Sequence, residues 1–339
     1  ARGERPLRLG MLLLSSLAAP EGVSASGTPM QPASSSPSKP HIVMVLADDL
    51  GWNQVGYQSD GRVSTPRIDA LAGVGVRLTR MYAHFICSPS RSALQSGRAP
   101  HRVNLENYAD FGYLPGGGEW AYPGAPPLYE GLGSVMRRGG YATHMLGKWH
   151  AGMATAQQTP AGRGYDAALV HFSSTVSGWT YAAWDCEGCS RTDLWESGGD
   201  IPFPGRPASA LLNDPHCDRT TAAGWSGAGQ CVHVDESLAS RTEAIIAAHP
   251  LSGPEAKLLF LLLSPHAKHE PHDEPQVLEG CPARPSATTT LSGGPSATEA
   301  AAPNDIVQLR EAVWTTDCEA RMAVASLDGL VGRIADALQ

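Results

Sequence analysis

Two adjacent carboxylates, Asp48 and Asp49, follow an uninterrupted apolar run at 41–47. Adjacent carboxylate oxygens suit a hard divalent cation such as Ca²⁺ or Mg²⁺. Aspartate also forms turns and caps helices, so the pair by itself leaves both interpretations open. We therefore treat Asp48 and Asp49 as candidate metal ligands.

A cysteine and an arginine mark the start of a predicted helix at 88–96, which Ser88 would cap. Cys87 stands just before this helix, where backbone N–H groups and the helix dipole favour an anion. Arg91 follows four residues later and can share the same face. The spacing indicates an anion site, and the alternative is a structural cysteine beside a surface arginine.

A cation and an imidazole follow another predicted strand, at 141–146. In an extended segment Lys148 and His150, two residues apart, point to the same side. This pairing suits anion binding and proton transfer. A solvated loop is the alternative.

Three histidines, His266, His269 and His272, come after a third apolar run at 257–263. A loop histidine is usually exposed and without function, but several near a carboxylate pair favour a site. All these candidates therefore follow apolar runs typical of buried strands.

Helices alternate with these strands, which predicts an α/β fold: a large, mostly parallel sheet with helices on both faces. Chemistry in such folds lies beyond the carboxyl ends of the strands. A further strand is predicted at 76–83. The predicted helices cover 68–74, 88–96, 128–138, 237–248 and 319–339, and 160–229 is weakly patterned.

Composition excludes several classes of protein. The chain has 339 residues, a net charge of −8 and 17 % charged residues, without a long basic run, so nucleic-acid binding is not expected. Its 37 glycines and 27 prolines show no G-X-Y period, which excludes collagen.

The N-terminal region has the order of a secretory signal peptide. Three arginines precede an apolar run at 9–19, and small residues follow at 23–25. The run is too short for a transmembrane helix. We predict a signal peptide at 1–25 and a Ser/Pro linker at 26–40, with a disordered leader as the alternative. This prediction implies the secretory pathway, with a lysosomal or extracellular destination.

The seven cysteines are an odd number, which leaves one for another task. The Cys186-x-x-Cys189 spacing has no second pair to complete a zinc site. Disulfides among the six cysteines other than Cys87 are expected, with open connectivity.

The motifs together resemble the formylglycine-dependent type I sulfatases. They are Cys-Ser-Pro-Ser-Arg at 87–91 followed by Gly-Arg at 97–98, the Asp pair at 48–49, Gly-Lys-Trp-His at 147–150, and His-Glu-Pro at 269–271. The arylsulfatase B branch is the most similar. The resemblance implies an alkaline-phosphatase-like sulfatase catalytic domain over 41–339, with a loop insertion at about 281–303.

The resemblance also implies the reaction and its cofactors. A formylglycine-generating enzyme would read Cys87, Pro89 and Arg91 and convert Cys87 to Cα-formylglycine, whose hydrate attacks sulfur. Asp48, Asp49 and residue 87 would hold Ca²⁺, with Mg²⁺ as the second choice. The substrate would be a sulfated carbohydrate or an aryl sulfate.

The other matched residues receive roles by the same resemblance. Arg91 would orient the hydrate, and Lys148 would bind the hydrate and the sulfate. His150 would accept a proton from the hydrate. His269 would contact the sulfate or the leaving oxygen, with His266 as its rival.

Two features depart from the family. No Asp-Asn pair, which would complete the calcium site, occurs in the chain, and the helix at 319–339 resembles the one that precedes this pair. We therefore expect a truncated catalytic domain with weak Ca²⁺ affinity and little turnover. No N-x-[ST] sequon is present either. The alternatives are a phosphate or phosphonate monoester hydrolase and a non-catalytic binding protein of the same fold.

Overall fold

A computed structural model describes residues 11–15, 39–104, 123–183, 192–208, 231–250, 256–269 and 306–339. Side chains are described in these ranges except at 11–15 and 306–319. The histidine at 272, the expected insertion at 281–303, and Cys186, Cys189, Cys217 and Cys281 lie outside the described residues. Cys231 is disulfide-bonded.

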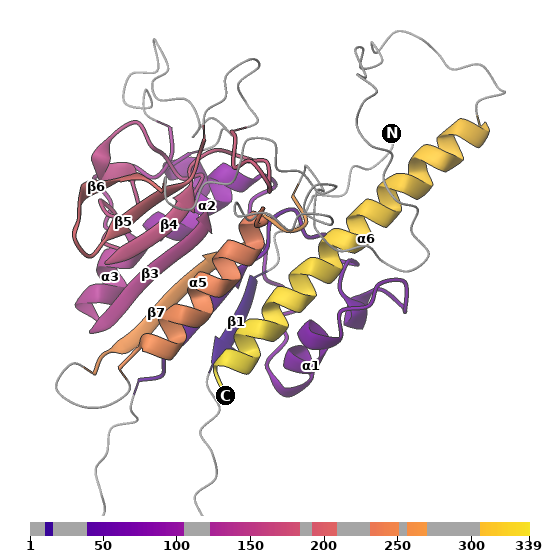
Figure 1. Cartoon of the computed structure of the whole chain (residues 1–339), viewed down its shortest axis with the longest axis horizontal. Helices are drawn as coiled ribbons and strands as arrows, with labels where there is room; N and C mark the ends of the chain where they lie inside the picture. Colours follow the sequence, from indigo (N-terminus) through magenta and orange to yellow (C-terminus); the bar gives the residue numbers. More distant parts are fainter. Residues whose placement is uncertain are drawn as a thin grey trace, which may run out of the picture.

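Seven strands form one mixed sheet in the order β1-β2-β7-β3-β4-β5-β6 (Figure 1). The central strands β2, β7, β3 and β4 are parallel, while β1, β5 and β6 pair antiparallel. The strands are β1 (Met11–Ser15), β2 (Ile42–Leu46), β3 (Tyr141–Lys148), β4 (Ala167–His171), β5 (Trp195–Gly198), β6 (Ile201–Pro207) and β7 (Leu258–Ser264). The predicted α/β class with its central parallel strands is confirmed.

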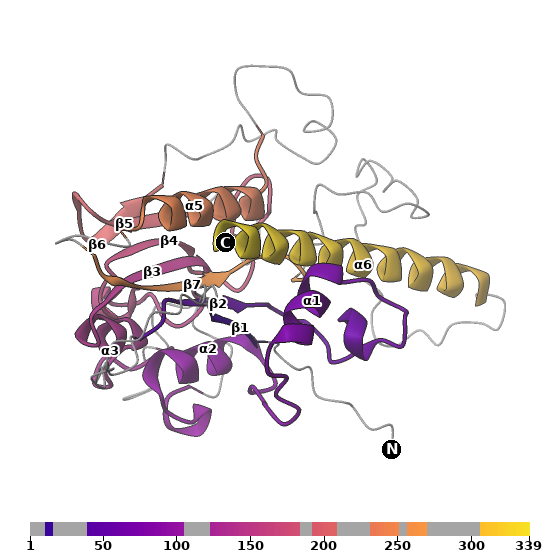
Figure 2. The ribbon, with the colours of Figure 1, turned by 90° about the horizontal axis from the view of Figure 1, so that it is seen from below.

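Helices cover both faces of the sheet, as Figure 2 shows. The helices α5 and α6 lie over one face, and α2 and α3 lie over the other. The α-helices are α1 (Pro66–Val74), α2 (Cys87–Ser96), α3 (Leu132–Arg138), α5 (Val234–Ala248) and α6 (Ile306–Ala337). Within the described ranges, short 3₁₀ turns occur at Gly56–Gln58, Pro100–Arg102 and Ala156–Gln158.

The side chains of the central strands point alternately to the two faces of the sheet and form a hydrophobic core on each face. In β2, Val43 and Val45 join the core beneath α5 and α6, whereas Met44 and Leu46 face the other layer. Strand β7 divides in the same way, because successive side chains point to opposite faces. Burial on both faces explains why these strands are continuous apolar runs in the sequence.

Two predicted elements are wrong. The segment 76–83 forms no strand, and its Val76 and Leu78 are exposed. Its Val76, Thr79 and Tyr82 are residue types that favour a strand, but a strand forms only where a sheet edge offers a partner. Ser88 does not cap α2: the helix begins at Cys87 with Ile86 in the cap position, and the buried Ser88 hydroxyl accepts a bond from Asn104.

Other boundaries shift. Helix α3 begins at Leu132 rather than at 128, and the weakly patterned region 160–229 contains β4, β5 and β6. The apolar run of the predicted signal peptide contains β1, which pairs with β2 at the sheet edge.

Candidate active site

The candidate residues meet at the carboxyl edge of the parallel strands. Lys148 and Ser264 are the last residues of β3 and β7, and Asp48 follows the end of β2. The chain turns sharply beyond each of these strands. Asp49, His150 and Lys268 have left-handed φ values of 49°, 44° and 80°.

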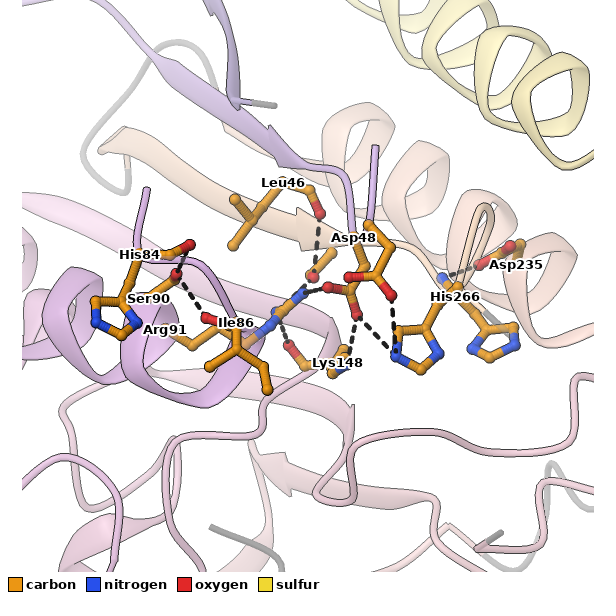
Figure 3. A network of polar contacts seen from close by, with 12 residues as sticks. Leu46, Asp48, His84, Ile86, Ser90, Arg91, Lys148, Asp235 and His266 are labelled. Carbon is orange, nitrogen blue, oxygen red and sulfur yellow. Dashed lines mark hydrogen bonds and ion pairs between the residues drawn. The ribbon is translucent and has the colours of Figure 1, made fainter. Parts of the chain in front are cut away.

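Asp48 lies at the centre of this edge between two cations (Figure 3). Its Oδ2 accepts a hydrogen bond from Lys148 Nζ, and its Oδ1 lies 3.5 Å from Arg91 Nη2. The three side chains are 0 to 2 % exposed. One buried carboxylate thus faces two buried cations, which leaves an excess of positive charge.

Arg91 is fixed by three strands at once. Its Nη1 donates to the backbone oxygen of Lys148 and to Ser264 Oγ, both at 2.8 Å. Ser264 Oγ in turn donates to the backbone oxygen of Leu46 at 3.2 Å. The guanidinium from α2 is therefore held in a single orientation against β2, β3 and β7.

Electrostatics keep Asp48 ionised. Burial alone would raise the pKa of this carboxyl, but the charges of Lys148 and Arg91 outweigh burial and hold the pKa well below its usual value. His269 adds to this effect. Asp48 is thus an anion throughout the neutral range.

Cys87 carries a buried thiol at the first residue of α2. Burial raises its pKa, and the nearby charges of Lys148 and Asp48 act in opposite directions. Because a thiolate is the reactive form of cysteine, this thiol is a poor nucleophile as it stands.

The histidines surround the same carboxylate from the loops after β3 and β7. His269 Nε2 lies 3.9 Å from Asp48 Oδ2 and 3.7 Å from Asp49 Oδ2. His150 is fully buried, and burial together with Lys148 and Arg91 holds its pKa well below the usual value. A neutral imidazole at this position can accept a proton.

His266 stands slightly apart from the central carboxylate. Its ring centroid lies 6.0 Å from that of His269. The carboxylate of Asp235 accepts hydrogen bonds from the backbone N–H groups of His266 and Ala267 at 2.6 and 2.7 Å, which fixes this loop (Figure 3).

Sequence reasoning missed two residues of this edge, Ser264 and His171. Both are fully buried, and the ring of His171 lies 6.3 Å from that of His266. Neither ring nitrogen of His171 has a hydrogen-bond partner among the described residues. Recognition of β4 would have placed His171 here, since it is paired with Lys148 on the neighbouring strand.

The carboxylates fit a hard cation in part. Asp48 Oδ1 is buried without a hydrogen-bond partner, and Asp49 provides a second carboxylate beside it. Within the described ranges, no group of three His, Cys, Asp or Glu side chains is arranged to hold a metal ion. The thiol sulfur of Cys87 is a soft ligand and does not suit Ca²⁺. Asp48 and Asp49 would therefore supply two ligands of a larger set.

A mixed, mostly parallel sheet with a buried cationic cluster at its carboxyl edge has the architecture of the alkaline-phosphatase-like sulfatase fold. The sulfatase family model matches residues 40–339. The chain belongs to the sulfatase family. The particular likeness to the arylsulfatase B branch is not confirmed by these matches and stays a prediction.

Individual relatives agree with this assignment. Arylsulfatase J from Mus musculus is 29 % identical over 239 residues, which cover 70 % of this chain and 34 % of that protein. Steryl-sulfatase from Homo sapiens is 36 % identical over 124 residues, or 36 % of this chain and 21 % of that protein. The matched part of the chain thus spans about a third or less of the length of these relatives.

Solved structures support the fold. Ps i-CgsB in complex with k-i-k-neocarrahexaose gives a TM-score of 0.54 at 19 % identity, covering 87 % of this chain and 54 % of that one. PsFucS1 sulfatase from Pseudoalteromonas sp. gives 0.55 at 20 % identity, covering 87 % and 51 %. No helix within the described residues is both long and apolar enough to cross a membrane.

Proposed function

We propose that this chain provides the catalytic centre of a sulfate ester hydrolase that acts on sulfated sugars or aryl sulfates. The observation that carries the proposal is the convergence of Arg91 and Lys148 on one buried carboxylate beside Cys87. This cluster keeps an excess of positive charge in a region of low dielectric, which suits a sulfate group.

Arg91 and Lys148 would bind and orient the anion. Arg91 Nε and Nη2 are buried without hydrogen-bond partners among the described residues, so the fixed guanidinium retains donors for an incoming oxygen. Lys148 Nζ has three donors and would bridge Asp48 and the sulfate.

Residue 87 would become the nucleophile only after modification, because its buried thiol is held in the neutral form. A formylglycine at this position would supply a hydrated aldehyde, with one hydroxyl as a nucleophile towards sulfur and a second to allow the sulfate to leave as the aldehyde forms again. A formylglycine-generating enzyme is the partner that this modification requires. The predicted signal peptide would bring the chain to the secretory pathway, where we place both proteins.

His150 and His269 would handle protons at this edge. The neutral imidazole of His150 is suited to accept a proton from residue 87. His269, which approaches both Asp48 and Asp49, would contact the sulfate or the leaving oxygen. His266 is the alternative residue for this contact with the sulfate or the leaving oxygen.

Asp48 and Asp49 would hold Ca²⁺, or Mg²⁺ as the second choice, with residue 87 contributing an oxygen after modification. The ion supplies Lewis-acid polarisation of a sulfate oxygen when it is bound. Asp48 keeps the negative charge that this role requires, since its pKa is held well below the usual value.

The modification of Cys87 provides a test that does not depend on turnover. The protein is expressed with and without a formylglycine-generating enzyme, and the tryptic peptide of residues 81–91 is analysed by mass spectrometry. We expect an aldehyde at residue 87 only when that enzyme is present, and no conversion in a Cys87→Ala control. A thiol that persists in protein from its native host would contradict the proposal.

The choice of ester needs a second measurement, because the same cations would bind a phosphate monoester. Protein purified from its native host is assayed on an aryl sulfate and on the matching aryl phosphate. We expect the sulfate to be hydrolysed faster. Faster phosphate hydrolysis would indicate a phosphate or phosphonate hydrolase, and no turnover of either would indicate a binding protein.

A further inference from the structure

A pocket lies towards the opposite end of the strands from the candidate active site. It has a volume of about 450 Å³ and lies between the second half of α5 and the amino-terminal parts of β3 and β7. Figure 1 shows α5 running across these two strands. His144, in this pocket, precedes Lys148 by four residues, which corresponds to roughly 13 Å along β3.

Nitrogen-bearing side chains dominate the polar part of this pocket. They are His144 from β3, Arg241 from α5, His249 at the end of α5, and Lys257 before β7. The described residues that line the pocket include no carboxylate. A cluster of this kind is unusual in a chain whose net charge is −8.

The two permanent cations form no ion pair within the described part of the chain. No carboxylate within the described residues pairs with Arg241 or Lys257. Arg333 of α6, in contrast, binds both Glu236 and Glu243 of α5. Arg241 therefore keeps its donors for another partner.

Compensation of the α5 dipole does not account for these cations. The dipole acts within the last turn of a helix, and Arg241 lies seven residues before the final residue, Ala248. The side chains of Ala244, Ile245 and Ala248 form an apolar wall beside it. The pocket thus combines positive charge with an apolar surface.

The histidines of this region have lowered pKa values, chiefly because they are partly buried. Burial lowers the pKa of His144 and of His41, and His249 lowers both further, whereas Asp166 raises that of His144. The rings of His41 and His249 meet edge to face, with centroids 5.4 Å apart. His41 Nδ1 accepts the backbone N–H of Leu259, and His249 Nε2 lies 2.7 Å from the oxygen of Lys257. Both rings are therefore held in place.

We propose that this pocket binds a small organic anion, whose acidic group is held by Arg241 and Lys257 and whose apolar part packs against Ala244, Ile245 and Ala248. The proposal does not depend on the sulfatase activity, because no residue of the carboxyl edge lines the pocket. Carboxylates and phosphate monoesters share the required chemistry.

The histidine rings allow the pocket to be observed separately from the candidate active site. Ring ¹H–¹³C resonances of the 339-residue protein are assigned with His144→Gln and His249→Gln variants. The protein is then titrated with benzoate, with phenyl phosphate, and with neutral benzamide. We expect the His144 and His249 resonances to shift with one or both anions and not with benzamide. The anion that binds more tightly, benzoate or phenyl phosphate, identifies the preferred acidic group.

An Arg241→Gln/Lys257→Gln double variant should bind the anion about tenfold more weakly or worse, because two charge-assisted hydrogen bonds are lost. Both side chains are exposed, so its circular dichroism and melting temperature should match the parent. Arg102→Gln changes an exposed arginine outside the pocket and should leave the titration unchanged. Equal shifts with benzamide, no shift with either anion, or unchanged affinity in the double variant would each overturn the proposal.

Discussion

Two arginine–carboxylate networks of this molecule differ in geometry and in setting. Arg333 joins α6 to Glu243 and Glu236 of α5 with distances of 2.7 and 2.8 Å, and these side chains are 36 to 52 % exposed. Arg91 lies 3.5 Å from Asp48, and both are at most 2 % exposed. The exposed Arg333 pairs, which solvent screens, therefore have the shorter distances. The buried Arg91–Asp48 pair, which solvent does not screen, has the longer one.

The two networks also differ in how completely their polar atoms are bonded. The exposed network uses its donors fully, and pairs of this kind contribute little to stability. The buried one leaves Arg91 Nε and Nη2 and Asp48 Oδ1 without hydrogen bonds among the described residues. Buried polar atoms without partners reduce stability, and their presence in a native fold calls for an explanation such as a bound ligand, ion or ordered water.

Asp48→Asn should give the largest effect of either network. The substitution leaves two buried cations without their carboxylate, which we expect to lower the free energy of unfolding by about 3–5 kcal/mol. Urea unfolding followed by circular dichroism measures the change. Asp49→Asn is the matched control, because this side chain is 43 % exposed and should lose less than about 1 kcal/mol. Equal stabilities of the two variants would mean that burial between two cations does not set the contribution of Asp48.

The stability difference between the parent protein and Asp48→Asn should depend on pH. Lys148 and Arg91 hold the pKa of Asp48 well below 3.8, despite the opposing effect of burial. The stabilisation by its charge is therefore complete above 3.8 and is lost as the pH falls towards the lowered pKa. The free energies of unfolding of the parent and of Asp48→Asn are measured above and below pH 3.8. They should become equal only in strong acid. Convergence near neutral pH would mean that Asp48 is not held as an anion.

Ser264→Ala should have an intermediate effect. The hydroxyl accepts from Arg91 and donates to Leu46, and its loss should lower the free energy of unfolding by about 1–3 kcal/mol. Anion affinity of the site should fall as well, because Arg91 loses part of its support. Ser96→Ala removes a buried hydroxyl that bonds only within its own helix region, and it should leave anion affinity unchanged. An equal loss of affinity in both variants would argue against the positioning of Arg91 by Ser264.

Arg333→Gln should give the smallest effect, about 0.2–1 kcal/mol, and the loss should diminish at high salt. Thermal unfolding at low and high ionic strength measures it. Arg241→Gln on α5 is the control, since that arginine has no carboxylate partner within the described residues. A loss from Arg333→Gln as large as that from Asp48→Asn would reverse the comparison.

Much of the carboxyl edge could be predicted from the sequence, for a physical reason. A strand buried on both faces is a continuous apolar run, so its end is visible, and polar residues at that end must meet those of neighbouring parallel strands. Asp48, Lys148 and His269 come together in this way. The arrangement of Arg91 could not be predicted, because its bonds to Ser264 and to the Lys148 backbone depend on how α2 packs.

The errors of prediction fall where local pattern does not decide the structure. Strand β4 ends at His171 but is only five residues long and lies in a glycine-rich region, so no periodicity marks it. The segment 76–83 contains residues that favour strands but has no strand partner, and Val76 is 89 % exposed. In both cases the sheet neighbour determines the outcome, and a single segment carries no information about its neighbour.

The left-handed backbone at Asp49, His150 and Lys268 has a consequence for laboratory evolution. A non-glycine residue in this conformation raises the energy of the native state by roughly 1–2 kcal/mol. Glycine would remove that strain at all three turns but would also remove the side chain. A library selected only for heat resistance should therefore accumulate glycine at these positions, and its most stable members should be the ones whose carboxyl edge can no longer bind an anion or move a proton.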